Sequence, residues 1–144
     1  MVEQVLDKSE VLAIIIRNEF SQPGVNFFTP DNFSQQIAYM KHSKGRIIHP
    51  HLHNSVRRDV YFTHEVLFVK KGLLRVDFYN DEKCYLESRI IGNGDAILLA
   101  AGGHGFEVLE DLEMIEVKQG PYAGEGDKTR FAGISSSEVK RKVE

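Results

Sequence analysis

The sequence predicts an all-β protein, a barrel or a sandwich. Short apolar or alternating stretches recur at intervals of roughly 8 to 12 residues, and clusters of glycine, proline, asparagine and aspartate separate them. No stretch shows the periodicity of about 3.6 residues that an amphipathic helix requires. We therefore expect at least seven short strands, without an internal repeat.

The length and net charge of the chain limit the classes of protein to which it can belong. A chain of 144 residues is expected to form a single domain, residues 1–144, with one core. It carries 18 basic and 21 acidic residues, a net charge of -3, and no basic stripe that would attract nucleic acid. The single Cys84 cannot form an internal disulfide, and the N-terminal residues lack the features of a secretion signal. The expected location is the cytoplasm.

The first third of the chain predicts brief strands. Residues 11–16 (VLAIII) are rich in β-branched side chains and predict a buried strand, far shorter than the roughly 20 residues of a membrane span. No membrane contact is therefore expected. Turn-forming residues follow at 21–24 and 29–32. Residues 34–41 are expected to be extended, with Ile37 and Tyr39 on one face.

Three histidines then alternate along the chain. His49, His51 and His53 would point to one side of a strand, because successive side chains of a strand alternate between its faces. Neighbours in this row would lie roughly 6.6 Å apart and the outer two roughly 13 Å apart. Two adjacent imidazoles can therefore share a metal ion, whereas His49 and His53 cannot. The spacing alone leaves open which pair does so.

The remaining elements follow from turn residues. Residues 54–64 predict a loop, and residues 65–69 and 73–79 predict a β-hairpin with its turn at 70–72. Further strands are expected at 85–91, 96–99, 106–109 and 114–118, the last two separated by a turn at Asp111. The polar tail, residues 134–144, predicts disorder or a frayed helix.

The histidine stretch resembles the first motif of the cupin superfamily. That motif is a glycine, five residues, His-x-His, a short gap, a glutamate, six residues and a glycine. Gly45, His51, His53, Glu65 and Gly72 fit it, except that eleven residues separate His53 from Glu65 where the family has three or four. Residues 54–64 would therefore be an inserted loop.

A second cupin motif is matched more loosely. It consists of a glycine, five residues, Pro-x-Gly, two residues, a histidine, three residues and an asparagine. Gly94, Gly102 and His104 follow it, but Ala100 replaces the proline, the histidine comes one residue early, and Val108 stands in place of the asparagine.

The resemblance covers about residues 36–118 and implies a double-stranded β-helix (jelly-roll) barrel, often a homodimer. It also implies one metal ion between the sheets, bound by His51, His53, Glu65 and His104, and so favours His51 and His53 over His49. Three imidazoles and one carboxylate suit a divalent transition metal such as iron, manganese, nickel or zinc. Such a set would leave one or two coordination positions for a ligand.

The sequence also allows other roles for these side chains. His51 and His53 could be solvent-facing or hydrogen-bonded inside the protein, and His104 could be a turn residue between glycines. We expect His49 to pack or to hydrogen-bond a ligand residue, and His64, which precedes Glu65, to lie on the surface.

Strand parity also predicts a pocket for a small molecule. If Glu65 and His104 point inward, Leu67 and Phe106 do so as well, and Tyr39 could join them. In the inserted loop, Arg57 could bind a carboxylate or phosphate, although a solvated charged loop is the simpler interpretation.

The predicted function is metal-dependent chemistry on a small molecule, such as oxygenation. One alternative is a sugar or sugar-nucleotide isomerase or epimerase, in which His49 or Tyr39 would move a proton. The other is a non-catalytic module that binds a small ligand. We expect no nucleic acid and no membrane among the partners.

Overall fold

The computed structural model describes residues 1–142 and is built almost entirely from β-strands. Within these residues the regular elements are eight strands and two short 3-10 helices. They are β1 (Val2–Asp7), β2 (Glu10–Ile16), β3 (Gly24–Phe27), β4 (Ala38–Lys41), β5 (Glu65–Tyr79), β6 (Tyr85–Ile91), β7 (Ala96–Leu99), β8 (Gly103–Lys118), η1 (Glu125–Asp127) and η2 (Ser136–Glu138).

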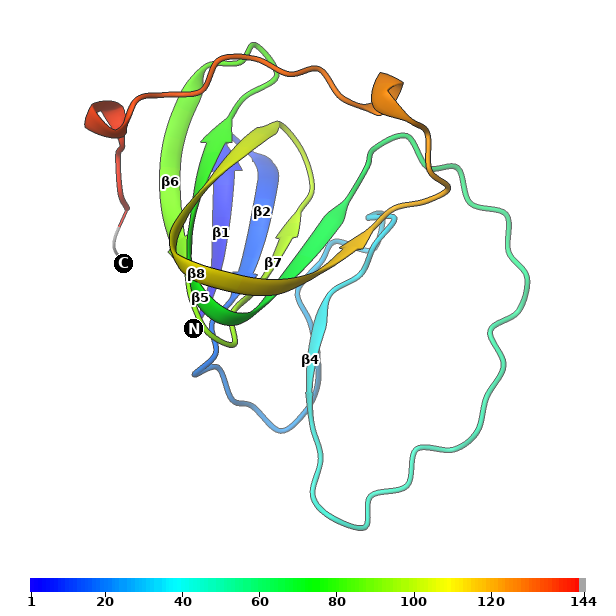
Figure 1. The fold of residues 1–144 in the computed structure, drawn as a ribbon. Helices are drawn as coiled ribbons and strands as arrows, with labels where there is room; N and C mark the ends of the chain where they lie inside the picture. The colour runs from blue at the N-terminus through cyan, green and yellow to red at the C-terminus, as the bar shows by residue number, and fades with distance from the viewer. Residues whose placement is uncertain (143–144) are drawn as a thin grey trace.

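One antiparallel sheet organises the molecule around β5. Its strand order is β1-β2-β7-β5-β6, and β8 also pairs with β5, while β3 and β4 form a separate two-stranded sheet. β8 follows β5 along nearly its whole length, and β7 and β6 pair with its first and second halves in turn. The sheet curls strongly around this long strand, so the all-β prediction is confirmed as a half-closed barrel (Figure 1).

The predicted hairpin at 65–79 is wrong, because these residues form one bent strand. Gly72 lies at the bend with φ 98°, and a Cβ at this position would lie 2.2 Å from the backbone oxygen of Asp111 in β8. The pairing of β5 with β8 shifts on either side of Lys71. β8 is likewise one strand where two were expected. The turn residues bend both strands together instead of reversing either, because each half of β5 pairs with β8.

The bend turns one sheet into two facing layers with the main core between them. The first half of β5 with β7, β2 and β1 forms one layer, and the second half of β5 with β6 forms the other. The prediction of a buried strand at 11–16 is confirmed by β2. The buried side chains between the layers are Val5, Leu12, Ala13, Ile15, Leu67, Val69, Leu74, Val76, Phe78, Ile91, Ile97 and Leu99.

A second, smaller core lies on the outer face of β2 and β7. Because side chains alternate along a strand, Ile14 and Ile16 of β2 point away from the main core. They pack with Leu98 and with Ile37, which precedes β4. Aromatic rings complete this cluster, and the ring of Tyr39 meets that of Phe20 edge-on at 5.0 Å between centroids. The sheet of β3 and β4 is thereby attached to the body.

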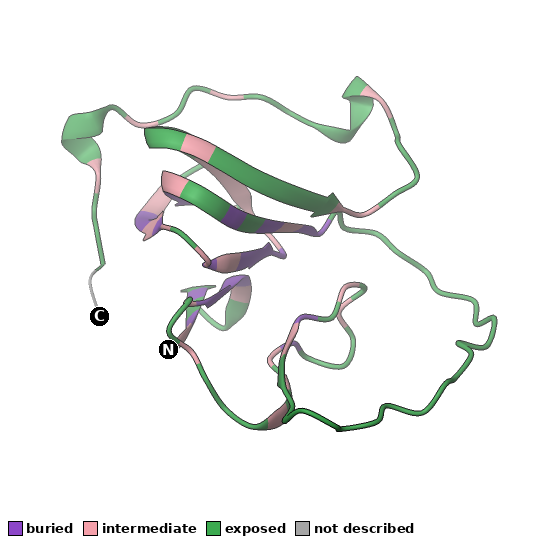
Figure 2. Cartoon of the chain, turned by 60° about the horizontal axis from the view of Figure 1, so that its bottom comes forward, coloured by how far each residue is buried: buried purple, intermediate pink, exposed green. Residues whose placement is uncertain are grey.

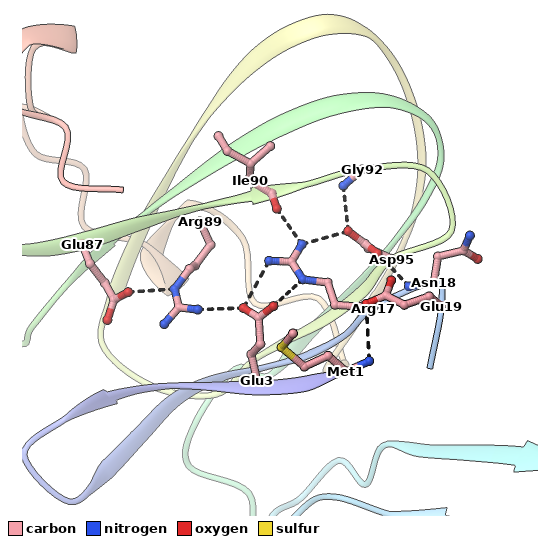
Figure 3. A network of polar contacts seen from close by, with 10 residues as sticks. All are labelled: Met1, Glu3, Arg17, Asn18, Glu19, Glu87, Arg89, Ile90, Gly92 and Asp95. Carbon is pink, nitrogen blue, oxygen red and sulfur yellow. Dashed lines mark hydrogen bonds and ion pairs between the residues drawn. The ribbon is translucent and has the colours of Figure 1, made fainter. Parts of the chain in front are cut away.

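Buried charges join the two ends of the strand order. Glu3 of β1 contacts Arg89 of β6 at 2.7 Å and Arg17, just after β2, at 2.6 Å (Figure 3). Arg17 also binds Asp95 at 3.0 Å, and Arg89 binds Glu87 at 2.7 Å. No backbone pairing links β1 to β6 within residues 1–142. Side chains therefore close this seam between the layers.

The seam fixes the charge of Glu3. Burial raises the pKa of its carboxyl, but the hydrogen bond from Arg17 and the charges of Arg17 and Arg89 outweigh burial and lower the pKa overall. The carboxylate is therefore ionised at neutral pH, which both guanidinium groups require as a partner.

The C-terminal segment lies along the outside of the second layer. The phenolic oxygen of Tyr85 accepts the backbone N–H of Lys140 at 2.7 Å, and Ser88 donates its N–H to the carbonyl of Lys140 at 2.9 Å. The described part of the predicted polar tail, 134–142, thus contacts the sheet and contains only η2 as helix. Residues 143 and 144 of that prediction lie outside the described residues.

Residues 40–63, here named the histidine segment, stand away from the body except at their two ends, where Lys41 belongs to β4 and Thr63 bonds Asp127. All of them are exposed, and no strand lies between the end of β4 at Lys41 and the start of β5 at Glu65 (Figure 2). The predicted histidine strand is therefore a loop in this structure. An isolated extended segment has no neighbour for its backbone hydrogen bonds, and a strand is stable only when paired.

No helix among the described residues is long and apolar enough to cross a membrane.

Removing the charge of Glu3 should destabilise the fold. Glu3→Gln leaves Arg17 and Arg89 without their shared carboxylate, and we expect a loss of about 3 kcal/mol in the free energy of unfolding. Glu19→Gln is the matched control, because Glu19 is exposed and pairs only with the N-terminal amine. It should change stability by less than about 0.5 kcal/mol. Urea unfolding measures both, and equal stabilities would contradict the role of the seam.

The same carboxylate should make stability depend on pH. Because folding lowers the pKa of Glu3, its contribution is present above the pKa of the unfolded state and is lost as the pH falls through the folded value. The stability gap between the wild type and Glu3→Gln should be constant from pH 6 to 8 and narrow below about pH 4.3. A gap that stays unchanged down to acid unfolding would contradict this assignment.

The bend should tolerate no side chain at residue 72. Gly72→Ala places a methyl group against the backbone of β8 at a positive φ, and we expect a loss of about 2 kcal/mol or more. Gly126→Ala is the control, since nothing lies within 4 Å of its added Cβ. Thermal or denaturant unfolding would contradict this account if the two variants were equally stable.

Candidate functional site

Glu65 and His104 face each other where the two layers meet. Glu65 begins β5 in the first layer, and His104 lies near the start of β8, opposite Phe78 of the second half of β5. The bend of β5 brings these halves together, and His104 Nε2 lies 3.2 Å from Glu65 Oε2. Glu65 is buried, and the imidazole is partly exposed. The pair combines a fixed carboxylate with a ring that solvent can reach.

The carboxyl of Glu65 is held in its ionised form. The hydrogen bond with His104 lowers its pKa and outweighs burial, which raises it, while the charges of Lys118 and Lys128 lower it further. A buried, ionised carboxylate with an imidazole nitrogen beside it can bind a cation.

A cavity of about 610 Å³ opens over this pair. Glu65, His104 and the glycine-rich corner before β8 line it, and residues 127–133 of the C-terminal segment form another wall. Acidic side chains outnumber basic ones around it. The charged lining residues besides Glu65 are Glu10, Asp81, Asp127, Lys128 and Arg130.

Aromatic side chains give the cavity an apolar part. Tyr79 meets Phe131 edge-on at 5.0 Å between ring centroids, and Tyr61 and Phe62 line the cavity from the end of the histidine segment. The Tyr79 oxygen accepts the backbone N–H of Ile134 at 3.0 Å. Its own proton is then available to donate to a ligand. The cavity suits a small molecule with apolar and polar parts.

The C-terminal wall is the part of the site that sequence reasoning missed. Residues 127–133 carry no motif, and nothing in their composition indicates that the chain returns to β5 after residue 118. The structure holds this wall through Phe131 against Tyr79 and through Thr63, whose hydroxyl donates to Asp127 at 2.9 Å. The sequence indicated only one of the contacts of this wall, Tyr79, which lies at the end of the predicted strand 73–79.

The four predicted metal ligands are brought together only in part. Glu65 and His104 are adjacent, whereas His51 and His53 lie on the exposed histidine segment with ring centroids 5.2 Å apart. Nδ1 of His51 lies 3.0 Å from the carbonyl oxygen of His49. Within residues 1–142 no three histidine, cysteine or acidic side chains are grouped closely enough to hold a metal ion. The donor types suit a divalent transition metal, but this arrangement provides two of the four.

The five predicted pocket residues lie elsewhere in this structure. Leu67 is in the main core, Tyr39 packs on Phe20, and His49 and Arg57 are exposed on the histidine segment, where Arg57 lies 3.6 Å from Asp59. Phe106 packs beside the His104 ring, with centroids 5.3 Å apart. None of them lines the cavity. Their role as substrate contacts stays a prediction.

His64 was expected on the surface, and that expectation is wrong. The side chain is buried against Phe33, its Nδ1 lies 3.2 Å from the hydroxyl of Ser34, and burial lowers its pKa. Parity was correct in turning His64 away from Glu65, but the segment before β4 covers this outer face. Cys84 is exposed.

No protein-family model, curated protein or solved structure matches this chain.

Proposed function

We propose that this protein is a metal-binding jelly-roll barrel of the cupin type that acts on a small molecule, through chemistry such as oxygenation. One divalent transition metal would be held by Glu65 and His104 together with His51 and His53. The observation that carries the proposal is the Glu65–His104 pair, whose facing atoms lie 3.2 Å apart and whose residues line a cavity.

The proposal is supported by the way the pair is built. Two residues 39 positions apart in the sequence come from opposite layers and meet with metal-binding atoms toward each other. The ionised Glu65 supplies a hard oxygen donor and His104 a nitrogen donor, a combination that suits iron, manganese, nickel or zinc. The acidic lining of the cavity favours a cation at this place.

The other two donors have to arrive with the histidine segment. Adjacent histidines of an extended strand lie roughly 6.6 Å apart, so His51 and His53 can reach one ion together. When bound, the metal would supply a Lewis-acidic centre with room for a ligand. The residues of the chain would then hold the ligand: Tyr79 by donating a hydrogen bond, and Phe131 by excluding water.

Metal content tests this proposal. Protein purified without a histidine tag should bind one equivalent of Fe²⁺, Mn²⁺, Ni²⁺ or Zn²⁺ by titration calorimetry and elemental analysis. Glu65→Gln, His104→Gln, and the double variant His51→Ala/His53→Ala should each lower the affinity by at least about 100-fold, because each removes a direct ligand.

His42→Ala and His49→Ala are the controls, since both remove an exposed histidine of the same segment. They should keep the wild-type stoichiometry. Circular dichroism establishes that each variant is folded. The proposal fails if the wild type binds none of the four metals, or if the Glu65 and His104 variants bind them as the wild type does.

A further inference from the structure

We infer that the histidine segment of one copy pairs with β8 of a second copy, so that His51 and His53 of each chain complete the Glu65–His104 pair of the other. This inference rests on the proposed metal site and adds where its second half comes from. It makes the site a shared one, formed only in a dimer.

β8 is a long edge strand with an uncovered face. Among the described residues it pairs with β5 alone, and none of its residues is buried. Phe106 and Val108 stand directly opposite Val76 and Leu74, which are completely buried, yet they are 43% and 58% exposed. Side chains opposite each other in a ladder share one face, so these two point to the interior of the half-closed barrel. An edge of this kind is a ready template for another strand.

Most of the histidine segment likewise lacks a neighbouring strand. Beyond Lys41, the last residue of β4, its backbone forms no pairing with a strand within residues 1–142, and its apolar side chains Ile47, Ile48, Leu52 and Val56 are all exposed. As a strand it would place His49, His51 and His53 on one face and Ile48 and Leu52 on the other. Pairing with β8 would give both backbones hydrogen-bond partners and would cover the inward face.

The charges of the two elements are opposite. The histidine segment has five basic residues (Lys41, Lys44, Arg46, Arg57, Arg58) and one acidic residue (Asp59). β8 has five acidic residues (Glu107, Glu110, Asp111, Glu113, Glu116) and one basic residue (Lys118). Attraction therefore favours the segment at this edge, and repulsion disfavours a second β8 there.

Both ends of the segment are held to the body of their own chain, the first in the β3–β4 sheet and the second beside the last residue of β8. Lys41 pairs with Gly24 across the β3–β4 sheet, and at the other end the carbonyl of His64 accepts the N–H of Gln119. Between these ends the segment projects as an open loop (Figures 1 and 2). In a two-fold dimer each copy would offer one segment and one β8 edge, so the β8 edges of both copies would be paired.

Mixing two variants that cannot bind metal alone tests the shared site. His51→Ala/His53→Ala keeps an intact Glu65–His104 pair, and Glu65→Gln/His104→Gln keeps an intact segment. After joint refolding, half of the dimers should be mixed, and each mixed dimer should hold one intact site. We expect about a quarter of the wild-type metal content per chain from random reassortment.

The results separate the two proposals. If the wild type binds one metal per chain and the refolded mixture binds no more than the separate variants, each chain completes its own site and the inference is overturned. Sedimentation of a metal-bound wild-type monomer would overturn it as well. If the wild type binds no metal at all, the proposed function fails first.

A charge variant tests the interface without touching the metal ligands. Glu110→Lys/Glu113→Lys should raise the dissociation constant of the dimer at least about tenfold at low salt, because it removes the attraction for the segment. Glu82→Lys, an exposed change in the turn between β5 and β6, is the control and should leave the dimer unchanged. Equal dissociation constants for all three proteins would contradict the proposed pairing.

Discussion

The arrangement of this molecule depends on the buried carboxylate of Glu3. β1 and β6 are the two ends of the strand order, and Glu3 binds Arg89 across the seam between them while also binding Arg17. Removing charges from water is costly, and the cost is offset here because every member has more than one partner. The seam positions the two layers relative to each other, and the cavity lined by Glu65 and Tyr79, the first and last residues of β5, depends on that position.

The bend of β5 at Gly72 connects the layers that the seam positions to the candidate site. One strand, β5, contributes Glu65 to the first layer and Phe78 to the second, and Phe78 is the residue opposite His104. The carboxylate and the imidazole therefore meet because a single strand changes direction once. The close approach of Gly72 to Asp111 explains why β8 bends at the same place.

Much of the strand layout could be predicted from the sequence, and the connections between strands could not. The β-branched run at 11–16 and the turns around 92–95 indicated elements that the structure contains. Residues 70–72 look like a hairpin turn because glycine and lysine suit one, but neighbours on β8 decided that the chain bends instead. His64 shows the same limit, since its burial depends on residues 33 and 34 and not on its own strand.

Of the candidate site, the pair that lies on the sheet could be predicted from the sequence. Glu65 and His104 were implied by the resemblance to the cupin motifs, and the structure places them together. The C-terminal wall depends on contacts of Phe131 and Ile134 with Tyr79, for which no local pattern exists. The histidine segment has strong local signals, but after Lys41 it has no strand partner within residues 1–142, and a strand needs a partner as much as a pattern.

The central claim is that four side chains from two distant parts of the sequence converge on one cation. The most direct measurement is anomalous X-ray diffraction from crystals grown with Zn²⁺ or Mn²⁺. The account predicts one strong peak per chain at bonding distance, about 2.0–2.2 Å, from Glu65 and His104 and from His51 and His53. A peak away from Glu65 and His104, or no peak at saturating metal, would contradict it.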